Sequence, residues 1–148
     1  EFLPGIELEV FQNTDNKDDI LVSAASASRM AGMSAAWLKT AYTREKTLQR
    51  LCSHGFSGER RMVDVLIPRS NGMTRPCIAV SRKDMDAVFD YAALEAGKKE
   101  AIAIRNAFLL LGLTSVAGLN SSPEGVKQKF VHFYETCLAE QEAKRNVR

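Results

Sequence analysis

Residues that could carry out catalysis or bind a metal are few in this 148-residue chain, and they lie far apart. The cysteines are Cys52, Cys77 and Cys137, and the histidines are His54 and His132. An odd number of widely spaced cysteines without a CxxC pair favours neither a disulfide framework nor a zinc site. We therefore expect no metal and no cofactor, and free thiols are typical of a reducing cytoplasm.

Patterns typical of enzymes are also missing from the sequence. Residues 55–58 (GFSG) lack the Lys-Ser/Thr pair that completes a phosphate-binding loop. No GxSxG nucleophile elbow occurs. Asp84 and Asp86 are typical of a solvated helix surface, and Asp64 lies in an expected strand without the further acid and lysine of a nuclease. We expect a protein that binds and does not catalyse.

Cationic side chains are the remaining candidates for function. The chain has 20 basic and 18 acidic residues, so its net charge is only +2. A surface for nucleic acid would therefore have to come from local clustering of cations. The candidates are Lys39, Arg44, Lys46, Arg60, Arg61, Arg69 and Arg75.

The first of these cations lie in and just after the stretch from Ser23 to Tyr42, SAASASRMAGMSAAWLKTAY, which we expect to form two short helices across a tight turn. The first helix is expected over 24–31, with Ser23 as its cap. Gly32 supplies the left-handed residue of the turn, and only glycine adopts that conformation without cost. The second helix is expected to start at Ala35, with Ser34 as its N-cap.

Small and apolar residues in the same stretch have the spacing needed to pack two helices together. Ala27 and Ser28 are small where the helices must cross, and four further residues are expected to face inward: Ala31, Met33, Leu38 and Ala41. This pattern resembles the helix-turn-helix family of DNA-binding proteins, including its winged and MerR-like branches. An ordinary helical hairpin with a glycine C-cap stays open as the alternative.

A β-hairpin is expected after these helices. Residues 43–52 either extend the second helix or form a third helix capped by Thr43. Strands are then expected over 63–68 and 76–80, and Asn71-Gly72 is a strong turn signal between them. In winged members of the family such a hairpin contacts the phosphate backbone. A plain surface hairpin is the alternative interpretation.

Outside these segments, the sequence predicts a strand near the N-terminus and three helices from Ser81 onward. Alternation over 5–11 indicates a half-buried strand, 12–19 a loop, and 20–22 a short strand or a lead-in to the first helix. Glu1 and Phe2 resemble a cloning remnant and are left out of this expectation. Helices are expected over 81–96, over 98–111 with Gly112 as C-cap, and from Ser122 and Pro123 onward with a frayed charged tail.

The C-terminal helices suggest two further possibilities. The last one has an apolar stripe, which indicates either docking onto the same domain or a homodimer; it consists of Val126, Phe130, Phe133, Cys137 and Leu138. Residues 78–113 faintly resemble phage antirepressor-type proteins, because aromatic residues stand at Phe89, Tyr91 and Phe108. No apolar run is long enough to cross a bilayer.

The predicted fold class is α+β and mostly helical. It has a helix-turn-helix core with a wing-like β-hairpin over 1–80 and a C-terminal helical bundle over 81–148, packed together as one compact unit. From this resemblance we expect a regulator that binds double-stranded DNA sequence-specifically and acts on transcription or in a phage or mobile element. The free cysteines lead us to expect it in the cytoplasm. The alternative is a protein-interaction or self-association module whose C-terminal helices bind a partner.

The resemblance implies a role for each candidate residue. The second helix would lie in the major groove, where Lys39 and Arg44 contact base edges or phosphate and Lys46 follows a turn later. Hydroxyl donors to phosphate would be Ser34 and Thr40. The wing would use Arg69 and Arg75, with Arg60 and Arg61 adding phosphate contacts. Trp37 is more typical of packing than of base contact. A dimer would double these contacts and suit a palindromic site.

Overall fold

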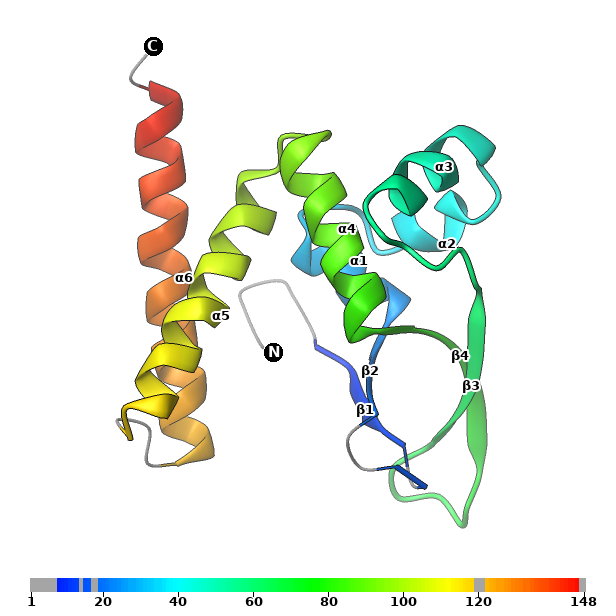
Figure 1. The fold of residues 1–148 in the computed structure, drawn as a ribbon. Coiled ribbons are helices and arrows are strands. Elements are labelled where there is room, and N and C mark those ends of the chain that lie inside the picture. Colours follow the sequence, from blue (N-terminus) through cyan, green and yellow to red (C-terminus); the bar gives the residue numbers. More distant parts are fainter. Residues whose placement is uncertain (1–7, 14, 17–18, 119–121, 147–148) are drawn as a thin grey trace.

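The protein combines a small sheet with six helices in the part of the chain that the computed structural model describes, residues 8–13, 15–16, 19–118 and 122–146 (Figure 1). The elements follow in the order β1 (Val10–Gln12), β2 (Ile20–Ser23), α1 (Ala24–Met30), α2 (Trp37–Ala41), α3 (Glu45–Ser53), β3 (Arg61–Leu66), β4 (Thr74–Ser81), α4 (Arg82–Leu94), α5 (Lys99–Val116) and α6 (Pro123–Asn146). The predicted α+β, mostly helical class is therefore confirmed.

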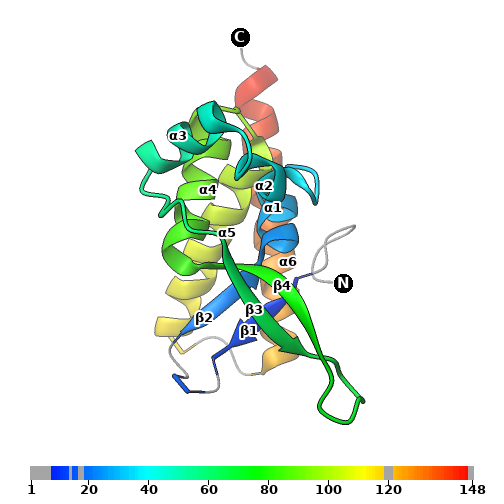
Figure 2. The ribbon, with the colours of Figure 1, turned by 90° about the vertical axis from the view of Figure 1, so that its right-hand side faces the viewer.

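The four strands form one curled antiparallel sheet in the order β1-β2-β4-β3. β-Branched residues favour this extended backbone, and Val22 lies opposite both Val10 and Val80. β4 is the longest strand and bends between β2 and β3 (Figure 1). The curl separates the β3–β4 ribbon from β1 and β2, and Figure 2 shows the loop end of this ribbon projecting beyond the rest of the sheet.

The N-terminal strand is shorter than the alternation predicts. β1 begins at Val10 and not at Gly5, and residues 5–7 of the predicted strand lie outside the described residues. Leu8 packs against the core although it is not in a strand. For 20–22 the structure shows a strand, because Leu21 and Val22 are buried between β1 and β4.

The first predicted helix and the turn after it are confirmed. The Ser23 hydroxyl accepts a hydrogen bond from the Ser26 backbone N–H at 3.1 Å and so caps α1. Gly32 has a φ of +82°, as the turn requires. The inward residues pack as predicted, because Ala31 and Leu38 are fully buried, Ala41 is nearly so, and Met33 packs partly buried against the core.

The start of the second helix was predicted wrongly. α2 begins at Trp37 and not at Ala35, and Ser34 does not cap it. The cap comes from the neighbouring helix: the buried Ser28 hydroxyl donates to the Ala24 carbonyl at 2.8 Å and accepts from the Leu38 N–H at 3.1 Å. A tertiary contact thus satisfies the free amide that the sequence pattern assigned to a local serine.

A separate third helix follows, and the prediction that Thr43 caps it is wrong. α3 begins at Glu45 after Arg44, which makes no side-chain cap bond. The Thr43 hydroxyl instead donates to the Thr40 carbonyl at 2.7 Å. Both predicted strands of the hairpin are present as β3 and β4. The loop between them spans 67–73, and its ends meet where the Ile67 N–H donates to the Met73 carbonyl at 2.9 Å.

The helix predicted to end at Gly112 continues to Val116, so that C-cap was predicted wrongly. Gly112 has no positive φ, whereas Gly118, just beyond the last residue of the helix, has a φ of +73°. A glycine forms this kind of helix C-cap only where its backbone is left-handed, and the backbone of Gly112 stays helical.

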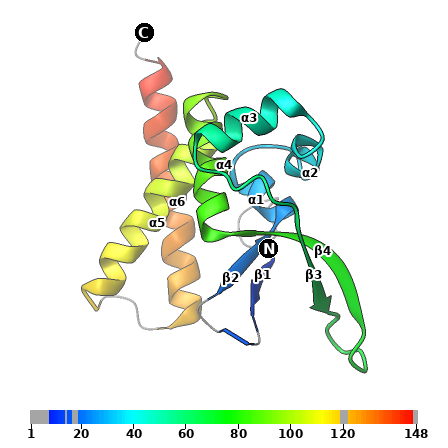
Figure 3. The ribbon, with the colours of Figure 1, turned by 45° about the vertical axis from the view of Figure 1, so that its right-hand side comes forward.

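α6 follows as an antiparallel partner of α5 (Figure 3). Its first turn is capped by Ser122, whose hydroxyl accepts from the Gly125 N–H at 3.0 Å. The apolar stripe of α6 docks on the same chain, because Phe130 and Cys137 are almost fully buried and the Phe130 ring centroid lies 4.5 Å from that of Phe108. The charged tail was predicted to fray, but α6 stays helical to Asn146.

One hydrophobic core joins the sheet, the short helices and the C-terminal helices. Its largest buried side chains come from β4 and from all six helices: Met30, Leu38, Leu51, Val80, Val88, Ile104 and Phe130. Both sides of Ser81, the boundary between the predicted regions, therefore contribute to it. None of the described helices is long and apolar enough to cross a membrane.

Candidate nucleic-acid interface

An open hollow of about 370 Å³ lies between the N-terminal part of α1, α2 and the β3–β4 ribbon. Three cations from separate segments line it: Lys39 of α2, Arg60 just before β3, and Arg75 of β4. Met62 and Ile78 are among its apolar lining residues. We call this site the basic hollow. Figure 3 shows α2 and the ribbon on the same side of the molecule, away from α6.

Local structure places each of these cations at the hollow. Leu38 and Ala41 of α2 are buried in the core, which leaves the neighbouring Lys39 exposed. Arg60 lies in the extended segment leading into β3, and Arg75 is the second residue of β4. The Ser28 bond to the N-terminal end of α2 ties this helix, and with it Lys39, to α1.

A carboxylate also lines the basic hollow. Glu9 forms an ion pair with Arg75, so one of the three cations is neutralised in the free protein. The Glu9 backbone N–H donates to the Ser26 hydroxyl at 2.9 Å, and this bond ties the segment before β1 to α1. The pKa of the adjacent Cys77 thiol is raised by burial and by the charge of Glu9, while Arg75 acts in the opposite direction.

Arg61 lies in a different place from Arg60. It forms an ion pair with Asp19 at 3.2 Å and lines a second hollow, inside the curl of the sheet. Hydrogen bonds from Asn13 and then from Arg61 hold the pKa of the Asp19 carboxyl below its ordinary value. Neighbouring side chains of an extended chain point to opposite sides, which is why the Arg60-Arg61 pair divides between two surfaces.

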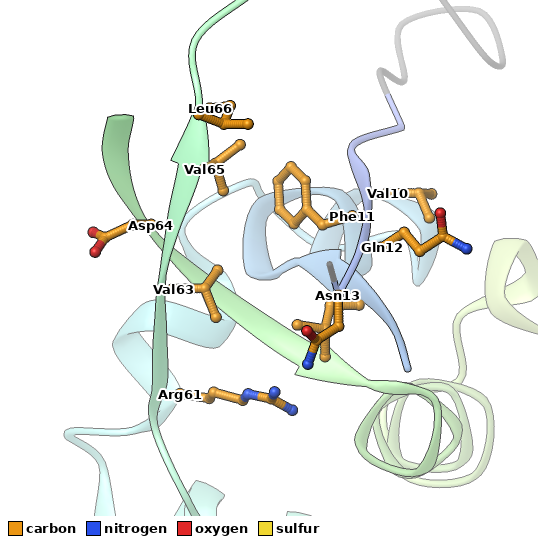
Figure 4. A pocket seen from close by; sticks show the side chains of 10 residues that line it. Val10, Phe11, Gln12, Asn13, Arg61, Val63, Asp64, Val65 and Leu66 are labelled. Carbon is orange, nitrogen blue, oxygen red and sulfur yellow. The ribbon is translucent and has the colours of Figure 1, made fainter. Parts of the chain in front are cut away.

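The second hollow has a volume of about 430 Å³ and mostly apolar walls. Figure 4 shows Val63 and Val65 of β3 pointing toward Phe11 of β1, while Asp64 points away. Among the residues that the structure describes, Arg61 is the one cation that lines it, and Asp19 already neutralises that charge. This arrangement offers an apolar recess but no pair of groups suited to acid-base catalysis.

The other six predicted contact residues do not line the basic hollow. Ser34 is exposed in the turn before α2, and Thr40 is half-buried. Arg44 and Lys46 are exposed at the start of α3, and Arg69 is exposed in the ribbon loop with a φ of +64°. The hollow therefore brings together three of the nine predicted residues: Lys39, Arg60 and Arg75.

Trp37 packs against the domain, as its sequence context indicates. Its ring centroid lies 5.3 Å from that of Tyr91 on α4. This contact joins α2 to α4 and turns the indole away from the role of a base-contacting residue. The exposed surface of α2 is then left mainly to its polar side chains.

Charge is unevenly distributed along the chain, which the overall value of +2 conceals. Residues 24–80 contain nine basic and three acidic residues, a net charge of +6, whereas residues 1–23 contain one basic and six acidic residues. Glu9 and Asp19 belong to this acidic segment, and each pairs with an arginine of the basic segment. No pattern in the sequence pointed to a role for either carboxylate, because only the sheet pairing brings them to their partners.

Within the described residues, no group of three or more His, Cys, Asp or Glu side chains lies close enough together to hold a metal ion. Comparison of the chain with models of known protein families, with curated proteins and with solved structures found no match.

Proposed function

We propose that this protein binds double-stranded DNA through the basic hollow and the cations around it. The observation that carries the proposal is the convergence of Lys39, Arg60 and Arg75 on one open concave surface. A concave surface with several cations matches the spaced charges of a phosphate backbone, which supplies most of the affinity of DNA-binding proteins.

In this proposal the three short helices form a helix-turn-helix core and the β3–β4 ribbon acts as its wing. α2 has only five residues, so it offers few side chains to base edges. Arg44 and Lys46 at the start of α3 extend its cationic surface, and Arg69 in the ribbon loop reaches the neighbouring backbone. Hydroxyls of Ser34 and Thr40 donate to phosphate.

The proposed biological role is that of a regulator, of transcription or of a phage or mobile element. Few cations line the hollow, and Glu9 neutralises one of them, so a single copy should bind weakly. Two copies on a palindromic site would double the phosphate contacts, with half-sites about one helical turn apart.

The test is a titration of fluorescent duplex DNA at several salt concentrations with the wild-type chain, Lys39→Ala and Arg60→Ala. Each variant should lose about tenfold in affinity at low salt, and the slope of log K against log salt should fall by about 0.9 for each lost phosphate contact. Lys127→Ala, an exposed lysine on α6, is the matched control and should leave both values unchanged.

Two results would contradict the proposal. One is the absence of binding to any duplex at low salt. The other is an equal loss of affinity in the Lys127 control, which would show that only net charge matters. Selection of bound fragments from a random duplex pool then tests sequence specificity, since a protein that uses the hollow for phosphate alone would enrich no common sequence.

A second candidate function is a protein-interaction or self-association module. It is favoured by the exposed apolar side chains of α5, among them Leu109 and Leu113. The two candidates use opposite sides of the molecule, because α2 and the ribbon lie on one side and α5 and α6 on the other (Figure 1). They can therefore be tested separately, and one chain can have both functions.

A further inference from the structure

The C-terminal half of α5 exposes an unusual amount of apolar surface. Of the eleven large apolar side chains that are exposed among the described residues, five lie within 108–116: Phe108, Leu109, Leu110, Leu113 and Val116. Leu109, Leu113 and Val116 have i, i+4, i+7 spacing and so share one helix face, with exposed fractions of 62%, 59% and 91%. We call this face the α5 stripe.

The α5 stripe continues a face that is already used for helix packing. One turn earlier on the same face, Arg105 bonds to Asp90 of α4 at 2.7 Å and to the Asp86 carbonyl at 3.3 Å. Figure 1 shows α5 diverging from α4 toward its C-terminal end, so the next turns of this face lack that cover. The other side of α5 is occupied by α6, where Phe130 is buried.

The α5 stripe lies in a stretch of the sequence that holds no charged residue. No charged residue occurs between Arg105 and Glu124 in the sequence. The centres of stable protein interfaces are likewise depleted of charge, whereas an ordinary solvated helix end carries it. A partner with a charged binding surface would find no counter-charge on this part of α5, so its charges would lose water without gaining an ion pair. The same stripe of a second copy holds no charge and loses nothing in this way.

The exposed area fits a second copy of the same chain. The three side chains of the α5 stripe expose on the order of 350 Å² of apolar surface, somewhat under half of the roughly 800 Å² that one partner contributes to a standard interface. Neighbouring uncharged backbone and side chains would supply the rim. Gly112 also lies within the α5 stripe, and a Cβ added there would meet nothing within 4 Å, so a facing helix could approach closely.

We propose that the protein forms a two-fold symmetric dimer in which the α5 stripes of two copies pack against each other. The hairpin of α5 and α6 would pair with the same hairpin of a second copy, so that four helices pack together. A two-fold axis brings the same residues of both copies into the interface. The sequence pattern left two roles open for the apolar stripe of α6, docking onto the same chain or a homodimer. Phe130 and Cys137 of that stripe are buried within the chain, so we place the dimer interface on α5.

The test is sedimentation equilibrium of the full chain without DNA, over a wide range of concentration. The wild-type chain should show a monomer–dimer equilibrium. The double variant Leu109→Glu/Leu113→Glu should raise the dimer dissociation constant by about 30-fold or more, because it places charges in the interface centre. Leu66→Glu on the ribbon is the matched control, since Leu66 has the same 62% exposure as Leu109, and it should leave the dimer intact.

Three outcomes would overturn the proposal: a wild-type chain that is monomeric at every concentration, a double variant that dimerises as well as the wild type, or equal disruption by Leu66→Glu. Both altered leucines are exposed, so the variants should keep their fold, which circular dichroism checks. The proposal does not rest on DNA binding. A dimer that binds no duplex would refute the proposed function and leave this inference standing.

Discussion

Glu9 and Arg75 form an ion pair across the basic hollow, although 66 positions separate them in the sequence. The pair places a carboxylate where the proposed function puts a phosphate. If the proposed function is right, DNA has to displace Glu9 before Arg75 can contribute to binding.

Removal of the Glu9 charge should strengthen DNA binding. We expect Glu9→Gln to raise duplex affinity by about three- to tenfold at low salt and to make the salt slope steeper by about 0.9, since Arg75 is then free for one phosphate. Fluorescence titration at several salt concentrations measures both. Glu140→Gln on α6 changes the net charge equally, so an equal gain in that variant would contradict a specific role for Glu9.

Loss of the Ser28 hydroxyl should destabilise the turn between α1 and α2. In Ser28→Ala the Leu38 N–H loses its buried partner, and an unsatisfied buried donor costs about 1–3 kcal/mol. Urea denaturation should show this as a lower midpoint with an unchanged m-value. Ser34→Ala is the matched control, because Ser34 is exposed and makes no cap bond, and it should change the unfolding free energy by less than about 0.5 kcal/mol.

A side chain at Gly32 should be more costly than one at another left-handed glycine. Gly32 and Gly72 have φ values of +82° and +77°, so alanine is strained by roughly 1 kcal/mol at either position. At Gly32 the added Cβ would also lie 3.0 Å from Glu100 Oε2, whereas at Gly72 it would meet nothing within 4 Å.

Thermal unfolding should therefore give Gly32→Ala a lower melting temperature than Gly72→Ala. Glu100→Ala combined with Gly32→Ala should recover part of the difference between them, because it removes the contact with Glu100 Oε2 and leaves the one with Glu100 Cβ at 3.3 Å. Equal melting temperatures for the two glycine variants would show that Glu100 moves aside without cost.

Tyr42 should limit stability at alkaline pH. Burial, aided by the charge of Asp84, raises the pKa of Tyr42 from 10.0 to about 12, and its hydroxyl has no hydrogen-bond partner among the described residues. The neutral Tyr42 side chain therefore contributes fully to folding stability below pH 10, the pKa of tyrosine in the unfolded chain. This contribution is lost as the pH rises toward 12.

Tyr42→Phe should remove this alkaline loss. At neutral pH it should leave the unfolding free energy unchanged or raise it by about 1 kcal/mol, because the buried hydroxyl gains no partner on folding. Urea denaturation at about pH 7 and about pH 11 measures both effects. Tyr91→Phe, also half-buried, is the control, and an identical pH profile for both variants would place the alkaline loss elsewhere.

The sequence by itself determined the elements whose signals are local. Ser23 and Ser81 cap α1 and α4 because a serine can reach the amide three residues ahead. Gly32 marks a left-handed turn for the same kind of reason, since its conformation depends on the residue itself. β-Branched residues and the Asn71-Gly72 turn signal likewise located the β3–β4 ribbon. In each case the atoms that interact are neighbours in the chain.

Only the tertiary structure decided where the charges and the apolar surfaces go. Ser28 caps α2 from another helix, and Glu9 and Asp19 reach arginines far along the chain. Arg60 and Arg61 separate because the backbone is extended there, and α5 continues through Gly112, leaving its stripe exposed. The energy of such contacts depends on distances that folding sets, so no local pattern of residue types contains them.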